Sequence, residues 1–245
     1  MSAPLITLAS DFGGGSAYIA MLKGALLTRC PTARLVDLSH ELDGEDIFPA
    51  ALLWLRVYSY YPAGTIHLLA LDRGGGPDRV LAAAAAGQFW LAMDEGGLGL
   101  ILEQHPEAQV RAVPLPVRGS FVARDQMAPL AAAMAASGML PGHPVADWSA
   151  LSLPVLTPQP DGGVMAEVIH VDRFGNLLLN ARKAGYRQAE VNGTVITRSD
   201  GHFGTAAAGA LLLRAGPEGF MEIALAQGSA ASRLNARRGT KVGLR

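Results

Sequence analysis

A chain of 245 residues, half of them hydrophobic and 17% charged with a net charge of −1, has the composition of a compact globular protein. It carries no basic stripe, which excludes charge-driven nucleic-acid binding, and the Arg-rich stretch 233–245 is interpreted as a solvated face. The single cysteine, Cys30, excludes an internal disulfide framework and a multi-cysteine metal site.

The sequence shows no targeting or membrane-spanning pattern. It does not begin with a basic region followed by an apolar one, and no segment reaches about 18 consecutive apolar residues. The six histidines have neither helical nor hairpin metal-ligand spacing. We therefore expect a soluble, cytoplasmic protein with no membrane partner and no bound metal.

The first predicted elements are a buried strand over 5–9 and a mostly buried helix that begins near Ala17. Asp11 and the glycines 13–15 lie between them. In open α/β sheets ligands bind beyond the carboxyl ends of the strands, so Asp11 is a candidate ligand residue. The glycine spacing matches neither a dinucleotide fingerprint nor a phosphate-binding loop, and a plain tight turn fits the same residues.

The next elements extend this α/β pattern to about residue 150. We expect strands over 33–38, 65–71, 80–86, 88–93 and 108–113, of which 80–86 and 88–93 form a pair around Gly87, with helices over 43–60 and 129–139. They predict an N-terminal domain, 1–150, with an open, mostly parallel sheet and flanking helices. Asp11, Asp72 and Asp94 each end a strand before a glycine turn, so they either share one crevice or cap separate turns. Arg79 fits an ion-pair partner of Asp72 or a surface arginine.

The sequence pattern changes after residue 150. Prolines and glycines crowd into 151–163, which predicts a linker, and short alternating segments in 164–245 predict a small all-β domain, a barrel or a sandwich. The densest polar run there contains Asp172, Phe174 and Asn176. These residues suit an ammonium group, an apolar ring and a carboxylate or amide respectively, and they equally suit a β-turn with side-chain caps.

Taken in order, these motifs resemble one family, the S-adenosylmethionine (SAM) hydroxide adenosyltransferases, which are relatives of the SAM-dependent chlorinases and fluorinases. The resemblance implies an α/β N-terminal domain, a β-barrel C-terminal domain and a homotrimer with SAM bound between neighbouring subunits. The matching runs span nearly the whole chain: Ser10-Asp11-Phe12-Gly13, Val36-Asp37-Leu38-Ser39-His40-Glu41, Pro62-Ala63-Gly64-Thr65-Ile66-His67, Asp72 with Arg79, Arg124-Asp125, Asp172-Arg173-Phe174-Gly175-Asn176 and Gly228-Ser229-Ala230-Ala231.

The reaction implied by the resemblance is attack of water or hydroxide on the ribose C5′ of SAM, which gives adenosine and methionine. SAM is then the substrate, and no separate cofactor is implied. Asp72 and Arg79 match the catalytic residues. The matching substrate-binding positions are Asp11, Ser16, Asp94, Asp172, Phe174, Asn176, Ser229 and Ala230, of which Asp172 and Asn176 would hold the methionine part and Ser229 and Ala230 the adenine.

Five positions depart from the family pattern. Glu95 stands where the family has an asparagine before Gly96, and Arg73 where it has a proline after the catalytic aspartate. Val122 stands where the family has a catalytic histidine, Ser16 where it has a ribose-binding carboxylate, and Pro217 where it has a serine near the ligand carboxylate. Two hypotheses follow: a SAM hydrolase that works without the histidine, or a relative that binds SAM, adenosine or another small ligand without turnover. A halide nucleophile in place of water is a third option, because valine makes that corner more apolar.

Overall fold

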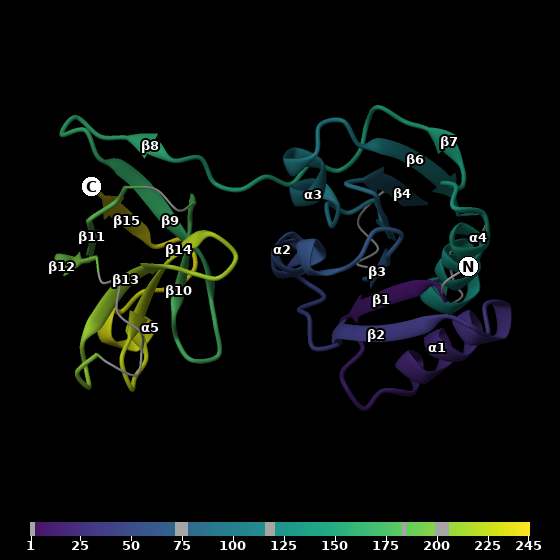
Figure 1. Cartoon of the computed structure of the whole chain (residues 1–245), viewed down its shortest axis with the longest axis horizontal. Helices are drawn as coiled ribbons and strands as arrows, with labels where there is room; N and C mark the ends of the chain where they lie inside the picture. The colour runs from purple at the N-terminus through teal and green to yellow at the C-terminus, as the bar shows by residue number, and fades with distance from the viewer. Residues whose placement is uncertain (1–2, 72–77, 116–120, 183–184, 199–205) are drawn as a thin grey trace. The chain divides into compact units, whose positions relative to one another are not determined.

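The computed structural model describes residues 3–71, 78–115, 121–182, 185–198 and 206–245 (Figure 1). The chain divides into two compact units, Met1–Ser152 and Leu153–Arg245, which we call unit 1 and unit 2. Among the described residues, no helix has the length and apolar character needed to cross a membrane.

Unit 1 is built on one mixed sheet. Its strands lie in the order β2 (Arg34–Ser39), β1 (Leu5–Ser10), β3 (Ile66–Ala70), β5 (Gln88–Met93), β4 (Arg79–Ala85), β6 (Gln109–Pro114) and β7 (His143–Pro144). The pairs among β2, β1, β3 and β5 are parallel, whereas β4 is antiparallel to β5 and β6. The expected mostly parallel sheet is therefore only partly confirmed. Ala86 and Gly87 both have positive φ and form a two-residue hairpin, which joins only antiparallel strands.

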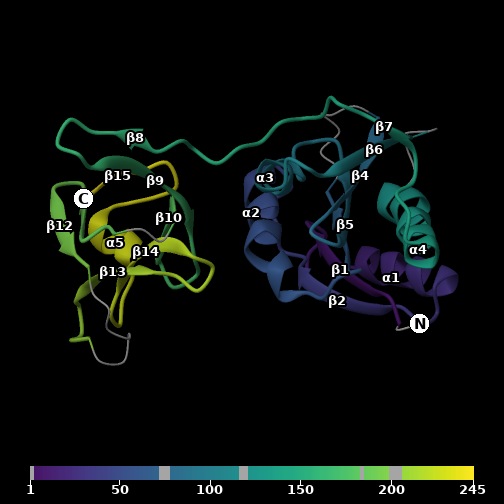
Figure 2. The same ribbon diagram turned by 45° about the horizontal axis from the view of Figure 1, so that its top comes forward.

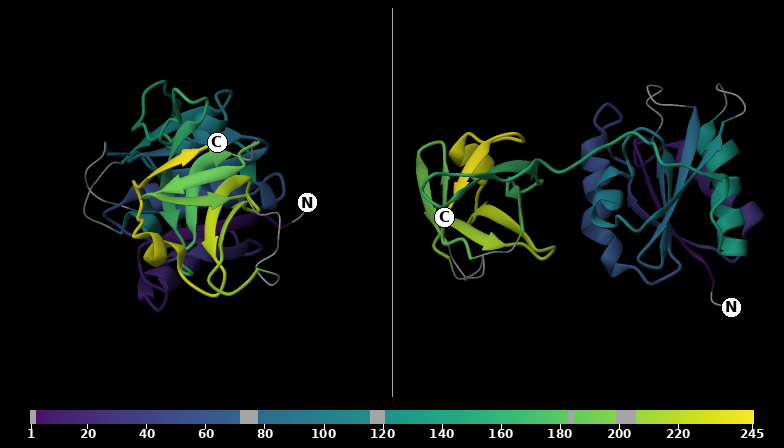
Figure 3. Two further views of the ribbon diagram at one scale, coloured as in Figure 1. Left: turned by 90° about the vertical axis from the view of Figure 1, so that its left-hand side faces the viewer. Right: turned by 90° about the horizontal axis from the view of Figure 1, so that it is seen from above.

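Helices cover both faces of this sheet. The helices α1 (Ala17–Arg29) and α4 (Ala128–Ser137) pack together on one face, while α2 (Ile47–Val57) and α3 (Gly99–Gln104) lie on the other (Figures 2 and 3). A 3₁₀ turn, η1 (Tyr58–Tyr60), follows α2, and a π-helical turn, η2 (Ala123–Met127), precedes α4. Apolar side chains of β1, β3, α1 and α4 form a buried core, which also contains Val122.

Unit 2 is a nearly closed, barrel-like sheet with one short helix. Its strand order is β12 (Thr194–Thr197), β11 (Gln188–Val191), β15 (Lys241–Leu244), β9 (Val164–Val171), β10 (Leu177–Arg182), β14 (Phe220–Leu225) and β13 (Leu211–Ala215). A bridge between Arg198 and Leu213 brings the two ends of this order together. The helix is α5 (Ala230–Leu234). A further short strand, β8 (Thr157–Pro158), lies inside the predicted linker and pairs with β9.

His67 on β3 lies in the core of unit 1, with 0% exposure. The side-chain amide nitrogen of Gln88 donates to the carbonyl oxygens of Tyr58 and Tyr61, so its oxygen is the acceptor for His67 Nε2, 3.0 Å away. The neutral ring then accepts from the Thr7 hydroxyl at Nδ1, 2.8 Å away. Burial lowers the pKa of His67 from 6.5 to about 4, although the hydrogen bond to Gln88 acts in the opposite direction.

This shift predicts how the stability of unit 1 depends on pH. The unfolded chain takes up a proton at His67 below about pH 6.5, whereas the folded chain does so only near pH 4. The free energy of unfolding therefore keeps its full value above pH 6.5. It falls by about 3 kcal/mol as the pH falls toward 4, because the unfolded chain binds the proton more tightly. Urea unfolding from pH 7.5 to 4 measures it, with His67→Gln as the non-titrating control. Equal pH slopes in the two proteins would contradict the assignment.

Candidate functional site

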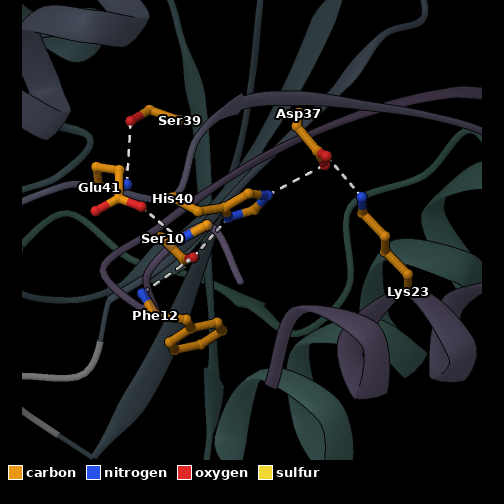
Figure 4. A network of polar contacts seen from close by, with 8 residues as sticks. Ser10, Phe12, Lys23, Asp37, Ser39, His40 and Glu41 are labelled. Atoms are coloured by element: carbon orange, nitrogen blue, oxygen red, sulfur yellow. Dashed lines mark hydrogen bonds and ion pairs between the residues drawn. The ribbon is translucent and has the colours of Figure 1, made fainter. Parts of the chain in front are cut away.

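The loop after β1 is held by a chain of polar contacts that begins on α1. Lys23 Nζ lies 2.6 Å from Asp37 Oδ2, and Asp37 Oδ1 lies 3.1 Å from Nε2 of the buried His40 (Figure 4). The other ring nitrogen of His40 is 2.7 Å from the hydroxyl oxygen of Ser10, which is fully buried at the end of β1. Burial tends to raise the pKa of Asp37, but hydrogen bonds from Lys23 and His40 outweigh it and hold this pKa below its ordinary value.

These contacts fix the backbone on both sides of Asp11. The Phe12 amide points toward the Ser10 hydroxyl at 3.4 Å, and the Gly13 amide donates to the His40 carbonyl at 2.7 Å. The carboxylate of Asp11 packs so closely against Gly44 that a Cβ there would collide with it. The predicted ligand residue therefore lies in a well-fixed turn at the carboxyl end of β1.

Aromatic rings surround the same turn. Phe121 packs against Phe12 and Tyr18, with ring centroids 5.3 and 5.1 Å apart, and Tyr18 is 55% exposed. Ser16 forms the N-cap of α1, where its hydroxyl accepts from the Tyr18 amide at 3.2 Å. The aromatic cluster was not predicted from the sequence, because Phe12 and Phe121 lie far apart in the chain.

A buried ion pair lies at the end of β5, the second strand end. Asp94 follows β5 and is fully buried, and its Oδ2 lies 2.7 Å from both Nε and Nη2 of Arg79. Its Oδ1 accepts from the Ser149 amide at 2.7 Å, and its carbonyl accepts from the Ser149 hydroxyl at 2.9 Å. The structure thus brings the predicted residues Arg79 and Asp94 together, while Asp72, the expected partner of Arg79, lies outside the described residues.

Val122 lies in the apolar core of unit 1. It is 6% exposed and belongs to the buried cluster that includes Ile66 and Leu68. The π-helical turn η2 begins at the next residue, and its Arg124 forms a two-contact ion pair with Asp125. An apolar side chain there cannot accept a proton or orient water.

In unit 2 the predicted residues converge on one corner. Asp172 Oδ1 accepts from the amides of Phe174 and Asn176 at 2.8 and 2.9 Å, and the Asn176 side chain donates to Asp172 Oδ2 at 2.9 Å. This turn joins β9 to β10 and leaves Phe174 62% exposed. The side-chain caps expected for a plain turn are present, and the same residues are the candidate ligand groups.

The loop before α5 packs directly against this turn. Ser229 caps α5 by accepting from the Ser232 amide, and the Ala231 amide donates to the Gly175 carbonyl at 2.9 Å. Gly175 has a φ of +82°, and a Cβ there would lie 2.6 Å from Ser229 Cβ. Ser229 and the buried Ala230 are therefore neighbours of the Asp172 turn, as a shared ligand site would require.

Pro217 lies at the second position of the tight turn between β13 and β14, where the Gly219 amide donates to the Gly216 carbonyl. Proline favours that position because its ring fixes φ near the value that the turn needs. In the part of the chain that the structure describes, no three His, Cys, Asp or Glu side chains gather closely enough to hold a metal.

The contact between Gly175 and Ser229 gives a matched pair of variants. Gly193 also has positive φ, +78°, but a Cβ there would meet nothing within 4 Å. Gly193→Ala should cost about 1–2 kcal/mol of stability from backbone strain alone. Gly175→Ala should cost roughly 1–3 kcal/mol more, because the new methyl displaces Ser229. Urea unfolding of both variants measures the difference, and equal losses would show that the two loops do not depend on this contact.

Comparison with known proteins gives matches that cover most of the chain. The model of the SAM hydroxide adenosyltransferase N-terminal domain matches residues 6–142, and that of the C-terminal domain matches 166–243. The chain is 32% identical over 256 residues to (R)-S-adenosyl-L-methionine hydrolase of Thermus thermophilus, covering 96% of this chain and 97% of that protein. It is 30% identical to the protein of the same name from Salinispora arenicola, with 95% and 94% covered. A fluorinase from Actinoplanes sp. is 24% identical, with 77% and 75% covered.

Two solved structures also match over nearly the full length of the chain. A conserved hypothetical protein from Thermus thermophilus matches with a TM-score of 0.79 and 30% identity, covering 99% of each chain. An uncharacterized conserved protein from Thermotoga maritima has a TM-score of 0.85 at 23% identity, covering 98% of this chain and 99% of that one, which shows the shared fold. The chain belongs to the SAM hydroxide adenosyltransferase family.

Proposed function

We propose that this protein hydrolyses SAM to adenosine and methionine. The observation that carries the proposal is the similarity, over nearly the full length of both chains, to relatives named (R)-S-adenosyl-L-methionine hydrolase. The oxygen of water forms a bond to C5′ while the C5′–S bond breaks. The sulfonium keeps the bonding electron pair and leaves as the neutral thioether of methionine, and one proton is released.

This chemistry needs little more than positioning. A sulfonium leaves as a neutral thioether, so no acid is required, and the enzyme has to align a water molecule with C5′ and keep competing water away. Arg79 suits the first task, because two of its nitrogens are held and Nη1 makes no hydrogen bond or ion pair with the residues that the structure describes. We propose Asp72 as the group that accepts the proton.

We propose that the corner of unit 2 binds the rest of the substrate. The carboxylate of Asp172 would hold the ammonium group of the methionine part, together with Asn176, and Phe174 would cover an apolar surface of the ligand. Ser229 and Ala230 would read the adenine. Packing of the Ser229 loop against the Asp172 turn supports this assignment, because it fixes both sets of groups in one rigid corner.

In unit 1 we propose that Asp11 and Ser16 contact the ribose.

We also propose a homotrimer, as the family resemblance implies. Light scattering coupled to size exclusion should then give three times the mass of the chain.

A second function, binding without turnover, is favoured by two observations. Val122 lies in the apolar core, and the Ser16 hydroxyl caps α1, so neither replaces the residue expected from the family. Incubation with SAM, followed by chromatography of adenosine and methionine, separates the two functions. If the protein hydrolyses SAM, both products form in equal amounts, at a rate well above the rate without protein. Binding of SAM with neither product would establish the second function.

The role of Asp172 predicts a selective effect on affinity. Asp172→Asn can still accept from the Phe174 and Asn176 amides but lacks the negative charge. SAM affinity should fall roughly ten- to a hundredfold, about 1.5–3 kcal/mol for a hydrogen bond to a charged group. Adenosine, which has no ammonium group, should bind as it does to the wild type. Titration calorimetry of both ligands measures this, and an unchanged SAM affinity would contradict the assignment.

A further inference from the structure

We propose that Asp94 is a positioning residue that fixes the guanidinium of Arg79, and that Ser149 in turn fixes Asp94. The sequence predicted Asp94 as a substrate contact, whereas its surroundings indicate a role that acts through Arg79. This inference rests on the proposed function, since it concerns the arginine assigned to the attacking water.

Burial closes the carboxylate of Asp94 to a substrate, and donors within the fold already reach both of its oxygens. It is 0% exposed, Oδ2 is shared by Nε and Nη2 of Arg79, and Oδ1 accepts from the Ser149 amide. A buried carboxylate is stable only when donors satisfy it, and removing one partner strands the other charge. The hydrogen bond that Arg79 donates to Asp94 raises the pKa of Arg79 further above its ordinary value, so the guanidinium keeps its charge.

Arg79 is held from two directions. The sheet places Arg79 and Asp94 opposite each other, because β4 and β5 are antiparallel and the Asp94 amide donates to the Arg79 carbonyl at 3.2 Å. From the other side, Nη2 donates to the Asp147 carbonyl at 2.9 Å, with Asp147 Oδ2 at 3.6 Å. With Nε and Nη2 both engaged, the plane of the guanidinium is set, and the direction of Nη1 with it.

The stretch 145–152, which supplies Asp147 and Ser149, is itself held in place by contacts with β6 and α3. The Val145 amide donates to the Val110 carbonyl at 3.2 Å. Further along, Leu151 packs so closely on the start of α3 that a Cβ on Gly99 would lie 2.6 Å from Leu151 Cβ and 2.7 Å from its amide nitrogen. The missing side chain at Gly99 thus allows the approach that brings the Ser149 amide to Asp94.

Asp94→Asn is the first variant to measure, because it keeps the shape and removes the charge. If Asp94 acts through Arg79, kcat should fall about a hundredfold while the dissociation constant of SAM changes less than threefold. Arg79→Ala and the double variant complete the comparison. The double variant should be no slower than Arg79→Ala alone, and losses that multiply would overturn the proposal by showing an independent contact with the substrate.

A pair of glycine variants tests the role of the stretch 145–152. Gly99→Ala should lower kcat at least tenfold with SAM affinity unchanged, because the new methyl pushes Leu151 and hence Ser149 away. Gly24→Ala on α1 is the matched control, since a Cβ there would meet nothing within 4 Å, and it should leave kcat unchanged. A full rate in Gly99→Ala that remains folded by circular dichroism would overturn the role of Ser149.

A readout without substrate separates this inference from the proposed function. In ¹⁵N NMR spectra the Nε–H of Arg79 should exchange slowly with solvent in the wild type. It should exchange at least tenfold faster in Asp94→Asn and in Gly99→Ala, and not in Gly24→Ala. If the wild type turns over no SAM, the proposed function fails, and these exchange rates still decide the positioning role. An unchanged Nε–H exchange in Asp94→Asn would overturn it.

Discussion

A carboxylate with no access to solvent, that of Asp94, constrains the part of unit 1 proposed to carry the chemistry. Such a charge costs several kcal/mol to bury unless donors match its oxygens. Here the donors come from Arg79 on the neighbouring strand and from Ser149 in a distant stretch. Because these donors must reach Asp94, the orientation of Arg79 and the path of residues 147–151 are set. The close approach of Leu151 also requires that residue 99 has no side chain. The arginine that we propose to align the attacking water is thereby held by the fold itself.

The other candidate residues are fixed by the same kind of local arrangement. At the end of β1, the chain from Lys23 through His40 to Ser10 holds the turn that contains Asp11. In unit 2, the Asp172 side chain both builds its turn and offers the charge proposed for the substrate. The structural role and the proposed ligand role therefore coincide in one residue. For that reason a conservative substitution, which preserves the turn, separates them better than alanine does.

The sequence predicted what depends on local pattern. The strand ends at Asp11 and Asp94, the β-rich second unit and the turn at Asp172 follow from apolar runs and glycines, and the family resemblance is confirmed. The pairing of 80–86 with 88–93 around Gly87 is confirmed by β4 and β5. The place of β4 between β5 and β6 was not predicted, because an apolar run carries no signal for its neighbours in the sheet. Ser149 and Asp94 are 55 residues apart in the sequence, and no local sequence pattern predicts the hydrogen bonds between them. Asp72 stays a prediction, since it lies outside the described residues.

In the proposed hydrolysis, the oxygen of water becomes the 5′ oxygen of adenosine. Incubation of the protein with SAM in H₂¹⁸O, followed by mass spectrometry of both products, tests it most directly. We expect one ¹⁸O in the ribose part of adenosine and none in methionine. Label in the amino-acid product, or an adenosine-derived product without label, would mean that the bond broken is not C5′–S or that the nucleophile is not water, and would contradict the account.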